Sequence, residues 1–346
     1  MLEHVRVLEL TSGLGDYSGR ILAQLGARVT KVMPPGTDRS SLDWLAVNHG
    51  KQLRELALGT PVGDAALLEM LHDADILLLG VPPLPGALGA DFSARFPALI
   101  VVELAAFAKQ SPMAGEPVND LALMALSGIM NIVGEPDGPP LKLPGDQAYA
   151  LAGIQGVIAA LLALNDRASS GQGQRVRVSA YQSAVLAGYR DPIVWEWTGR
   201  LGRRSGNRLV RGQSGVRQVW ACKDGYVTWS MVDNPGLMKG TVALMAREGA
   251  AGVLAGVDWE HTLVADLPQT QIDAWEAPVE AFLLAHTTTE LVAMAAEVPI
   301  GLSVIATPAM ALMEPHWAQR NFWQQVHDPV RGLDLQLPGP LFVVQS

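Results

Sequence analysis

The sequence predicts an α/β protein with two domains: a larger one built on a doubly wound, mainly parallel β-sheet, and a smaller α+β domain. Short apolar runs alternate with helical stretches through residues 1–110. A stretch rich in arginine and glycine at 200–217 differs in composition from what precedes it and marks the expected domain boundary. Continuous apolar strands separated by helices are typical of a parallel sheet covered on both faces. At roughly 150 residues per domain, the 346 residues favour two domains.

Each half of the chain has its own predicted series of elements. In the first half the apolar patterns predict strands at 5–10, 27–32, 53–58, 74–81, 99–105 and 175–178, and helices at 17–25, 62–72, 120–132 and from Asp146 onward. In the second half we expect a hairpin from 218–222 and 226–231, then helices at 272–284 and 287–297, the latter opened by a capping box. The predicted domains are 1–199 and 217–305, with a linker at 200–216 and a return segment to the large domain at 306–346.

Composition narrows the class of protein. Thirty-four acidic against 25 basic side chains give a net charge of −9, the opposite of a nucleic-acid binder. A single cysteine, Cys222, and an N-terminus without a long apolar run predict a cytoplasmic protein. The apolar stretch 148–164 is 17 residues long, which is short for a membrane span and predicts a buried helix. The 49% of hydrophobic residues favours a large subunit interface.

Metal and triad chemistry find little support in the sequence. The seven histidines are scattered, and neither an HExxH zinc motif nor a GxSxG nucleophile motif occurs. Cys222 lies in a predicted hairpin strand, where packing is a better interpretation than nucleophilic catalysis. We therefore expect no metal.

A glycine-rich turn follows the first predicted strand. Gly13-Leu-Gly-Asp-Tyr-Ser-Gly19 resembles a dinucleotide-binding fingerprint, but its spacing is GxGxxxG. The acidic residue expected at the end of the second strand is missing, because that strand ends Lys31-Val-Met-Pro. A tight turn in a doubly wound sheet is favoured over a nicotinamide site.

Asp146 has two compatible interpretations. It follows Leu143-Pro-Gly and begins a long apolar helix, so it is expected to cap that helix by accepting backbone N–H bonds. The second interpretation is a nucleophilic carboxylate whose negative charge the helix N-terminus stabilises. The residues alone favour the cap.

An ordered set of motifs covers nearly the whole chain. They are Val5-Arg-Val-Leu-Glu-Leu-Thr11, Gly19-Arg-Ile-Leu-Ala-Gln-Leu-Gly26, Asp120-Leu-Ala-Leu-Met-Ala-Leu-Ser-Gly128, Gly134-Glu-Pro-Asp-Gly-Pro-Pro140, Gly145-Asp146, Ser170-Gly-Gln-Gly-Gln174, Arg203-Arg-Ser-Gly-Asn207 and Cys222-Lys-Asp-Gly-Tyr-Val227. Their order and spacing resemble family III CoA-transferases, which include formyl-CoA and carnitine CoA-transferases, and the related α-methylacyl-CoA racemases. In this resemblance Gly145-Asp146 stands in the position of the family's catalytic aspartate.

The resemblance implies a CoA-transferase that forms an interlocked homodimer. Asp146 would attack an acyl-CoA thioester, become an aspartyl-CoA thioester and pass CoA to a free carboxylic acid. The weak candidate for an oxyanion-binding loop is Arg211-Gly-Gln-Ser-Gly215. The small-molecule partners implied are acyl-CoA and a carboxylic acid, with neither nucleic acid nor membrane.

Predicted contacts with CoA lie near the ends of the first strands: Gly15, Arg39, Lys51, Leu56 and Asn119. An anionic ligand of a protein with net charge −9 requires locally concentrated positive charge. Lys31, Arg39, Lys51 and Arg54 form the basic group among the N-terminal loops. The denser cluster at 200–217 is an alternative phosphate site, but a solvated linker or dimer seam explains it equally well.

The chain also departs from the family pattern. Asn119 stands where the racemases have a catalytic histidine and where transferases often have tyrosine, and Pro82-Pro-Leu-Pro-Gly86 lacks the asparagine of the family's CoA-contacting loop. An asparagine cannot shuttle a proton at neutral pH, which disfavours racemase chemistry. A second hypothesis follows, in which the chain is a catalytically weak or silent member that acts as a binding or partner subunit.

Overall fold

The computed structural model describes residues 1–80, 92–211, 214–329, 331–340 and 342. Its internal packing divides the chain into two compact units. The larger consists of Met1–Ile132, Leu141–Gly202 and Pro315–Ser346, and the smaller of Val133–Pro140 and Arg203–Glu314. Segments 133–140 and 306–314, which the sequence pattern assigned to the large domain and the return segment, belong to the smaller unit.

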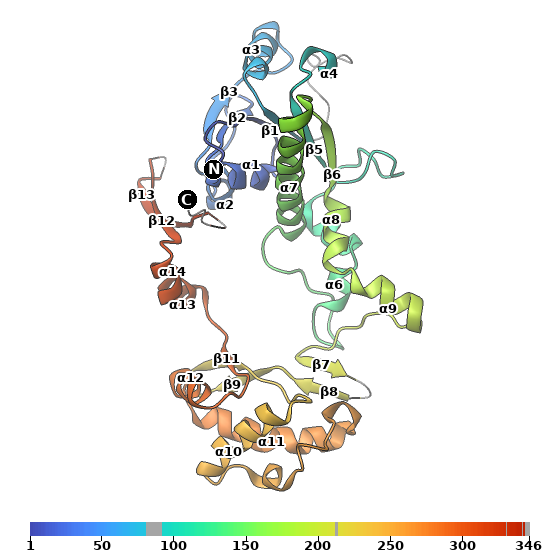
Figure 1. Ribbon diagram of the computed structural model, residues 1–346, viewed down its shortest axis with the longest axis vertical. Helices are drawn as coiled ribbons and strands as arrows, with labels where there is room; N and C mark the ends of the chain where they lie inside the picture. The colour runs from blue at the N-terminus through green and yellow to red at the C-terminus, as the bar shows by residue number, and fades with distance from the viewer. Residues whose placement is uncertain (81–91, 212–213, 330, 341, 343–346) are drawn as a thin grey trace. The chain divides into compact units, whose positions relative to one another are not determined.

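A six-stranded parallel sheet forms the centre of the larger unit (Figure 1). The strand order β3-β2-β1-β4-β5-β6 reverses direction between β1 and β4, as in doubly wound sheets. All five pairings are parallel, which confirms the predicted sheet. The strands are β1 (Arg6–Leu10), β2 (Arg28–Met33), β3 (Gln52–Glu55), β4 (Ile76–Gly80), β5 (Ile100–Ala105) and β6 (Arg175–Ser179).

Helices cover both faces of this sheet. On one face α1 and α7 pack through Ile21, Leu22 and Val157; on the other, α3 packs through Leu67 and Leu71. The helices of this unit are α1 (Asp16–Gln24), α2 (Leu42–Asn48), α3 (Pro61–His72), α4 (Phe92–Arg95), α5 (Asp120–Leu126), α6 (Ile129–Ile132), α7 (Gln147–Ser170), α8 (Ala180–Ala187), α9 (Arg190–Thr198) and α14 (Pro315–Gln319).

Helix α7 is the long buried helix expected after Asp146. It has 24 residues and, in the described part of the chain, is the one helix long and apolar enough to span a membrane. Its position is that of a core helix, because Ala148, Ala152 and Ala160 are fully buried between α1 and β5. The apolar count of 17 residues in the sequence underestimated its length, since the helix continues through a polar last turn to Ser170.

The predicted helix at 120–132 is wrong as a single element. Helix α5 ends at Leu126, and the chain turns at Gly128, whose φ is 86°, before α6 begins at Ile129. A residue with a side chain adopts that left-handed backbone reluctantly, whereas glycine adopts it freely. This turn ends α5 at Leu126. The N-terminus of α5 lies close to the start of α7, as the hydrogen bond between Tyr149 and Asp120 shows.

The smaller unit is α+β. A three-stranded antiparallel sheet in the order β11-β10-β9 packs on helices through buried Trp220 and Trp229, and the hairpin β9–β10 and the Thr287–Glu290 capping box confirm two predictions. The elements are β7 (Arg208–Arg211), β8 (Ser214–Arg217), β9 (Val219–Cys222), β10 (Gly225–Thr228), β11 (Ser303–Val304), α10 (Pro235–Arg247), η2 (Gly252–Gly256), η3 (Val264–Asp266), α11 (Gln269–Ala285), α12 (Thr288–Glu297) and α13 (Pro308–Met313).

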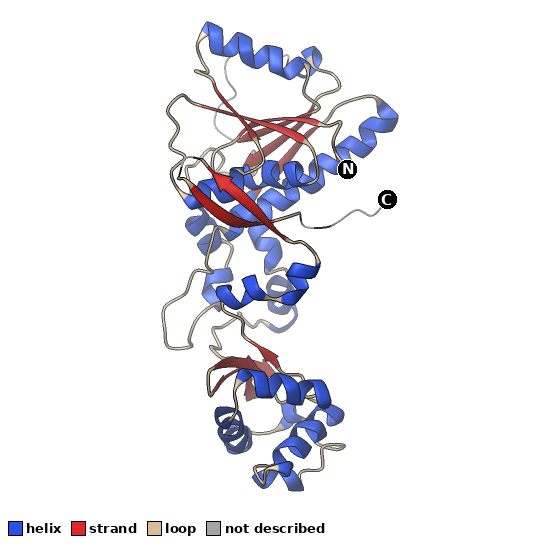
Figure 2. Cartoon of the chain, turned by 90° about the vertical axis from the view of Figure 1, so that its left-hand side faces the viewer, coloured by secondary structure: helices blue, strands red, loops and turns tan. Residues whose placement is uncertain are grey.

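The chain returns to the larger unit as a hairpin, β12 (Trp323–Asp328) and β13 (Leu333–Pro338), which lies against α1 (Figure 2). Arg20 and Gln24 of α1 donate hydrogen bonds to the carbonyl oxygen of Pro338. Arg331 donates to the carbonyl oxygens of Arg39, Ser40 and Ser41. The return segment therefore fixes the backbone of the loop that carries Arg39.

Candidate active site

Asp146 occupies the N-cap position of α7 but does not cap it. Its backbone has φ −100° and ψ 76°, and its side chain accepts no capping hydrogen bond from the described residues. The preceding Gly145 has φ 75°, a left-handed conformation that turns the chain into the helix. The side chain is 67% exposed. The expectation that Asp146 caps α7 is therefore wrong, and its carboxylate is presented to solvent at the positive end of the helix.

The cap of α7 comes from another helix. Asp120 Oδ1 accepts a hydrogen bond of 3.0 Å from the backbone N–H of Tyr149, the third residue of α7. Asp120 is in position because Asn119 caps α5, its Oδ1 accepting the N–H of Ala122 at 3.0 Å. Asn119 therefore caps α5, and Asp120 accepts an N–H from the first turn of α7. The side chain of Asp146 takes no part in either cap. The sequence motif contained Asp120, but no local pattern indicated that it caps a distant helix.

Lys142 lies beside both carboxylates. Its Nζ is 3.6 Å from Asp146 Oδ1 and 3.7 Å from Asp120 Oδ2. Asp120 is buried, Asp146 is exposed, and the lysine side chain is about one-third exposed. The start of α7 therefore combines a fixed buried anion, a cation and an accessible anion.

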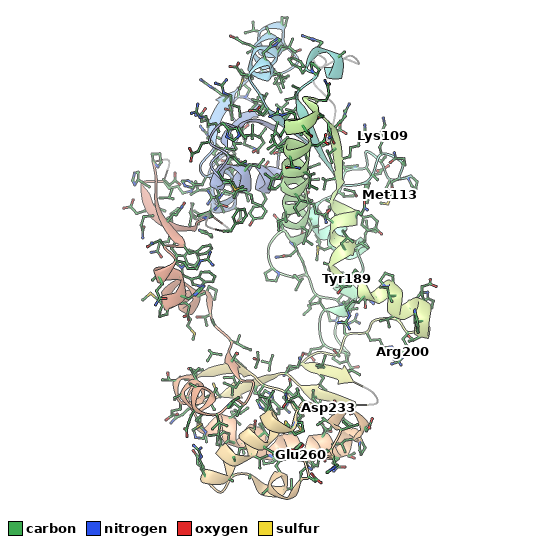
Figure 3. All side chains as sticks on the ribbon, viewed as in Figure 1. Lys109, Met113, Tyr189, Arg200, Asp233 and Glu260 are labelled. Atoms are coloured by element: carbon green, nitrogen blue, oxygen red, sulfur yellow. The ribbon has the colours of Figure 1, made fainter. Side chains whose placement is uncertain are left out.

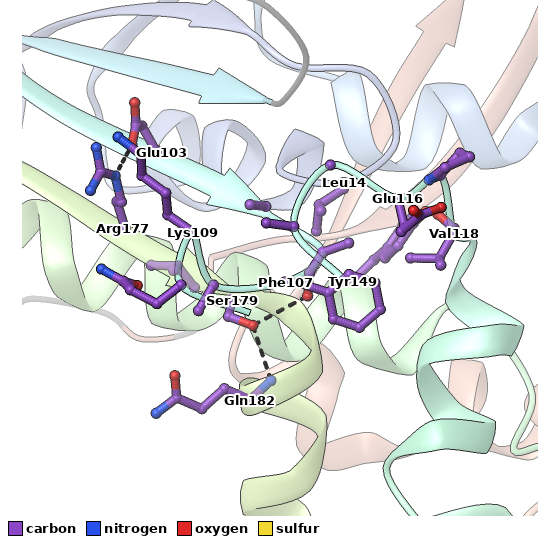
Figure 4. A pocket seen from close by; sticks show the side chains of 18 of the residues that line it. Leu14, Glu103, Phe107, Lys109, Glu116, Val118, Tyr149, Arg177, Ser179 and Gln182 are labelled. Atoms are coloured by element: carbon purple, nitrogen blue, oxygen red, sulfur yellow. Dashed lines mark hydrogen bonds and ion pairs between the residues drawn. The ribbon is translucent and has the colours of Figure 1, made fainter. Parts of the chain in front are cut away.

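A cavity of about 720 Å³ opens in the larger unit at the ends of β1, β5 and β6 (Figure 4). Its volume is that of a small-molecule site. Tyr149 lines it one turn after Asp146, although Asp146 itself does not. Burial, followed by the negative charges of Asp120 and Asp146, raises the pKa of the Tyr149 phenol. Tyr149 is thus a neutral group between the cavity and the two carboxylates at neutral pH.

Charged side chains line one wall of the cavity along β5 and β6 (Figure 4). Glu103 accepts hydrogen bonds from Arg175 and Arg177 of the edge strand β6. Burial acts to raise the pKa of Glu103, but the two guanidinium groups outweigh it, so the pKa is lowered. Two more charged side chains that line the cavity come from the loop after β5: Lys109 lies on the side of Glu103, and Glu116 lies on the opposite side, near Val118 and Tyr149 (Figure 4).

Lys51, predicted to contact CoA, is part of a buried ion cluster instead. Its Nζ donates to Glu9, to the carbonyl oxygen of Asp16 and to Asn48 at 2.7–2.9 Å, which uses all three N–H groups of the ammonium. Lys31 Nζ lies 2.8 Å from both Glu9 Oε1 and Asp16 Oδ1. Because the lysine side chains are inside and paired, we do not retain Lys51 or Lys31 as phosphate contacts.

The glycine-rich turn packs against the buried ion cluster, which consists of Glu9, Asp16, Lys31 and Lys51. A Cβ at Gly19 would lie 1.7 Å from Glu9 Oε2, so the position leaves no room for a side chain. Gly15 has φ 99°, and a Cβ there would approach Thr11 Cγ2 to 2.8 Å. Asp16 places a buried carboxylate in the first turn of α1, where a dinucleotide pyrophosphate would need positive surroundings. The geometry favours the tight-turn interpretation over a nicotinamide site.

The remaining predicted CoA contacts do not form one cluster with Asp146. Arg39 lies in the loop after β2, with its guanidinium 3.8 Å from Glu55 and 38% exposed. Leu56 directly follows β3 and packs, half-buried, on the apolar side of α3. Asn119 is exposed but its Oδ1 is engaged in capping α5. The segment Pro82-Pro-Leu-Pro-Gly86, which stands in the place of the family's CoA-contacting loop, lies outside the described residues, as do residues 212–213 of the predicted oxyanion loop.

Two arginines of the cluster at 200–217, Arg208 and Arg217, form ion pairs within the smaller unit. Arg208 pairs with Asp273 and Glu276 of α11. Arg217 pairs with Glu280 of the same helix and stacks 4.5 Å above the Trp220 ring. These pairs favour a structural role for Arg208 and Arg217 over a phosphate site.

No group of three or more metal-ligating side chains occurs among the residues that the structure describes. The start of α7 combines two carboxylates, a lysine and a phenol at a helix N-terminus. An exposed carboxylate at a helix start, beside a ligand-sized cavity, is suited to covalent acyl transfer.

The chain belongs to CoA-transferase family III, which it matches over residues 2–345, and it is related to α-methylacyl-CoA racemase. It is 25% identical to the BbsE subunit of the succinyl-CoA:(R)-benzylsuccinate CoA-transferase of Thauera aromatica, over 96% of this chain and 86% of that protein. It is 27% identical to succinyl-CoA–D-citramalate CoA-transferase of Chloroflexus aurantiacus, over 96% and 85%. The fold matches a CaiB/BaiF family protein from Brucella suis with a TM-score of 0.83 at 23% identity, covering 98% of this chain and 91% of that one. The protein is thus a family III CoA-transferase.

Proposed function

We propose that the enzyme moves CoA from an acyl-CoA thioester to a free carboxylic acid through covalent intermediates on Asp146. An Oδ of Asp146 bonds to the thioester carbonyl carbon, the C–S bond breaks, and CoA leaves as a thiolate. The thiolate then attacks the Asp146 carbonyl of the mixed anhydride, releasing the acyl group as a carboxylate and leaving aspartyl-CoA. An acceptor carboxylate reverses the sequence and departs as the new acyl-CoA.

The single observation that carries this proposal is the uncapped state of Asp146. Asp120 accepts the Tyr149 N–H, so Asp146 is not needed to start α7 and its carboxylate is accessible. The helix N-terminus favours negative charge there by about 0.3–1 kcal/mol. An accessible carboxylate that makes no capping hydrogen bond with the described residues is suited to act as a nucleophile.

We infer CoA contacts at Gly15, Arg39, Leu56 and Asn119, with the predicted oxyanion loop Arg211–Gly215 remaining a hypothesis. Arg39 is the strongest of these, because Arg331 holds the backbone of its loop and leaves the guanidinium partly exposed. A phosphate there would replace a loose ion pair to Glu55 at 3.8 Å. We also propose that the protein works in the cytoplasm.

We propose dicarboxylic acids as the substrate class, because the names of both full-length relatives join succinyl-CoA to a second dicarboxylic acid. The test incubates the protein with succinyl-CoA and, separately, benzylsuccinate, citramalate or butyrate, and measures new CoA thioesters by mass spectrometry. We expect transfer to a dicarboxylate and at least tenfold slower transfer to butyrate. Equal rates with butyrate would contradict the substrate class, and no thioester from any pair would contradict the transferase proposal for this donor.

The alternative is a catalytically weak or silent family member that acts as a binding or partner subunit. It rests on the departures from the family pattern, such as Asn119, whose Oδ1 caps α5. Absence of any rise in melting temperature with CoA would favour it, because a ligand that binds the folded state tightly stabilises it. Turnover would exclude a silent member.

We further propose an interlocked homodimer. Ile154, Ile158 and Leu162 form an exposed apolar stripe at four-residue spacing on α7, while Ala152, Gly156 and Ala160 of the same helix are buried in the core. A second exposed apolar stripe, formed by Tyr189, Ile193 and Trp197, runs along α9. Tyr189 lies at the junction between α8 and α9 (Figure 3). Contiguous apolar surface of this kind is typical of subunit interfaces.

Light scattering coupled to gel filtration measures the assembly. At micromolar concentration we expect the mass of two 36.8 kDa chains. Leu162→Glu and Trp197→Glu should shift the population toward monomers, because a charge buried in an apolar interface is strongly unfavourable. An unchanged mass in both variants would place the interface elsewhere, and a wild-type monomer would contradict the dimer.

A further inference from the structure

The strongest unexplained feature of the site is the placement of Lys142 between two carboxylates. Its ammonium is 3.7 Å from Asp120 Oδ2 and 3.6 Å from Asp146 Oδ1. Asp120 Oδ2 is buried and has no hydrogen-bond partner among the described residues, so this lysine supplies the positive charge that faces it. The other oxygen of Asp120 is already engaged with the N–H of Tyr149.

The two carboxylates are not equivalent partners for Lys142. Asp120 is held by α5 and by its hydrogen bond to the start of α7, and it bonds to no substrate in the proposed reaction. Asp146 loses its charge whenever it becomes an anhydride or a thioester. Lys142 is therefore anchored on one side to a carboxylate that takes no part in the bond changes, and it faces on the other a carboxylate whose charge comes and goes.

We propose that Lys142 is a positioning residue for the Asp146 nucleophile, anchored by Asp120; this inference rests on the proposed function. In the free enzyme its ammonium holds the Asp146 carboxylate at the start of α7. When the Oδ–C bond forms and the C–S bond breaks, the negative charge moves from Asp146 to the departing CoA sulfur. The ammonium then has no charged partner at Asp146 and favours retention of the thiolate until it attacks the aspartyl carbonyl.

The local chain explains why this lysine keeps its place. Lys142 and Asp146 are four residues apart but lie in a turn, Leu143-Pro-Gly145, rather than in a helix. Pro144 restricts the backbone, and Gly145 takes the left-handed conformation that brings position 146 back toward position 142. An ordinary surface ion pair would need neither feature.

The first part of the test needs no substrate. A water-soluble carbodiimide joins an amine to a carboxylate without a spacer, so only groups that reach contact are linked. Peptide mapping of treated wild-type protein should show Lys142 linked to Asp146 or Asp120. Lys142→Met should lose the product. Absence of any such link in the wild type would overturn the arrangement.

The second part measures covalent chemistry. Wild type, Lys142→Met, Lys142→Arg and the control Lys239→Met, which removes an exposed ion pair in the smaller unit, are mixed with succinyl-CoA and quenched with hydroxylamine. We expect Lys142→Met to form the Asp146 adduct at least tenfold more slowly, with KM changed less than threefold, and to melt lower because the buried Asp120 Oδ2 loses the positive charge that faces it. Lys142→Arg should recover most of the rate, and Lys239→Met should match the wild type.

The outcomes separate the two proposals. If wild type forms the adduct and Lys142→Met forms it equally fast, the role of Lys142 is overturned and the transferase proposal stands. If wild type gives the Lys142 cross-link but takes no group from succinyl-CoA or acetyl-CoA, the proposed function is overturned, together with the role given to this lysine. A slow Lys142→Met variant that is not rescued by arginine would show a merely structural role.

Discussion

Asp146→Asn is expected to lower CoA transfer by roughly 10³-fold or more while leaving the fold intact, because an amide is not a nucleophile toward a thioester. The free energy of unfolding should change by no more than about 0.5 kcal/mol, since the exposed side chain makes no capping hydrogen bond with the described residues. Initial rates with succinyl-CoA and urea unfolding of the same sample measure both quantities.

Two comparison variants make this result specific. Asp137→Asn removes an exposed carboxylate nine positions earlier and should leave the transfer rate unchanged. Asp120→Ala removes the group that accepts the Tyr149 N–H and should cost about 1–2 kcal/mol of stability, as the loss of a helix cap does. If Asp146→Asn destabilised the protein as much as Asp120→Ala, the division between capping and nucleophilic aspartates would be wrong.

Lys31→Met should have the largest effect on stability, about 3–5 kcal/mol, which is the usual cost of breaking a buried ion pair from one side. Lys31 is 3% exposed and contacts Glu9 and Asp16 at 2.8 Å, so its loss leaves two buried carboxylates with the charge of Lys51. Urea unfolding measures the change. The added substitution Asp16→Asn should restore part of it, because it removes the excess negative charge.

The same cluster predicts a direction of pH dependence. Burial acts to raise the pKa of Asp16, but the charges of Lys31 and Lys51 and two hydrogen bonds lower it below 3.8. A carboxyl with a lowered pKa in the folded state contributes stability above its unfolded pKa and loses it as the pH falls through the folded value. Wild type should therefore lose stability below about pH 4, and Asp16→Asn should lose less over the same interval. A loss under 1 kcal/mol for Lys31→Met, or identical acid profiles, would contradict the role of the cluster.

The sheet could be predicted because parallel strands buried on both faces are apolar runs, as 76–80 is and as 100–105 is apart from Glu103. Helix α9 was missed for the opposite reason. Its Ile193, Trp195 and Trp197 are exposed within this chain, so its apolar residues give no amphipathic period toward the core. The break at Gly128 also escaped, because a glycine inside a helical pattern is often tolerated.

The site was predictable in position and not in detail. The resemblance placed Asp146 at the start of a buried helix, where the structure has it. That Asp120 takes over its cap is a contact between residues 29 positions apart in the chain, which no local pattern encodes. Lys51 was expected beyond a strand end of an open sheet, but it directly precedes β3, and its ammonium pairs with the buried carboxylate of Glu9.

The central claim is that Asp146 carries the transferred group, and one measurement tests it most directly. Wild-type protein is mixed with succinyl-CoA, digested at low pH and examined by tandem mass spectrometry for the mass added to the peptide that contains the start of α7. The account predicts CoA, or the succinyl group, on Asp146, lost after hydroxylamine and absent from Asp146→Asn. Turnover without any adduct at Asp146, or an adduct on another carboxylate that persists in Asp146→Asn, would contradict it.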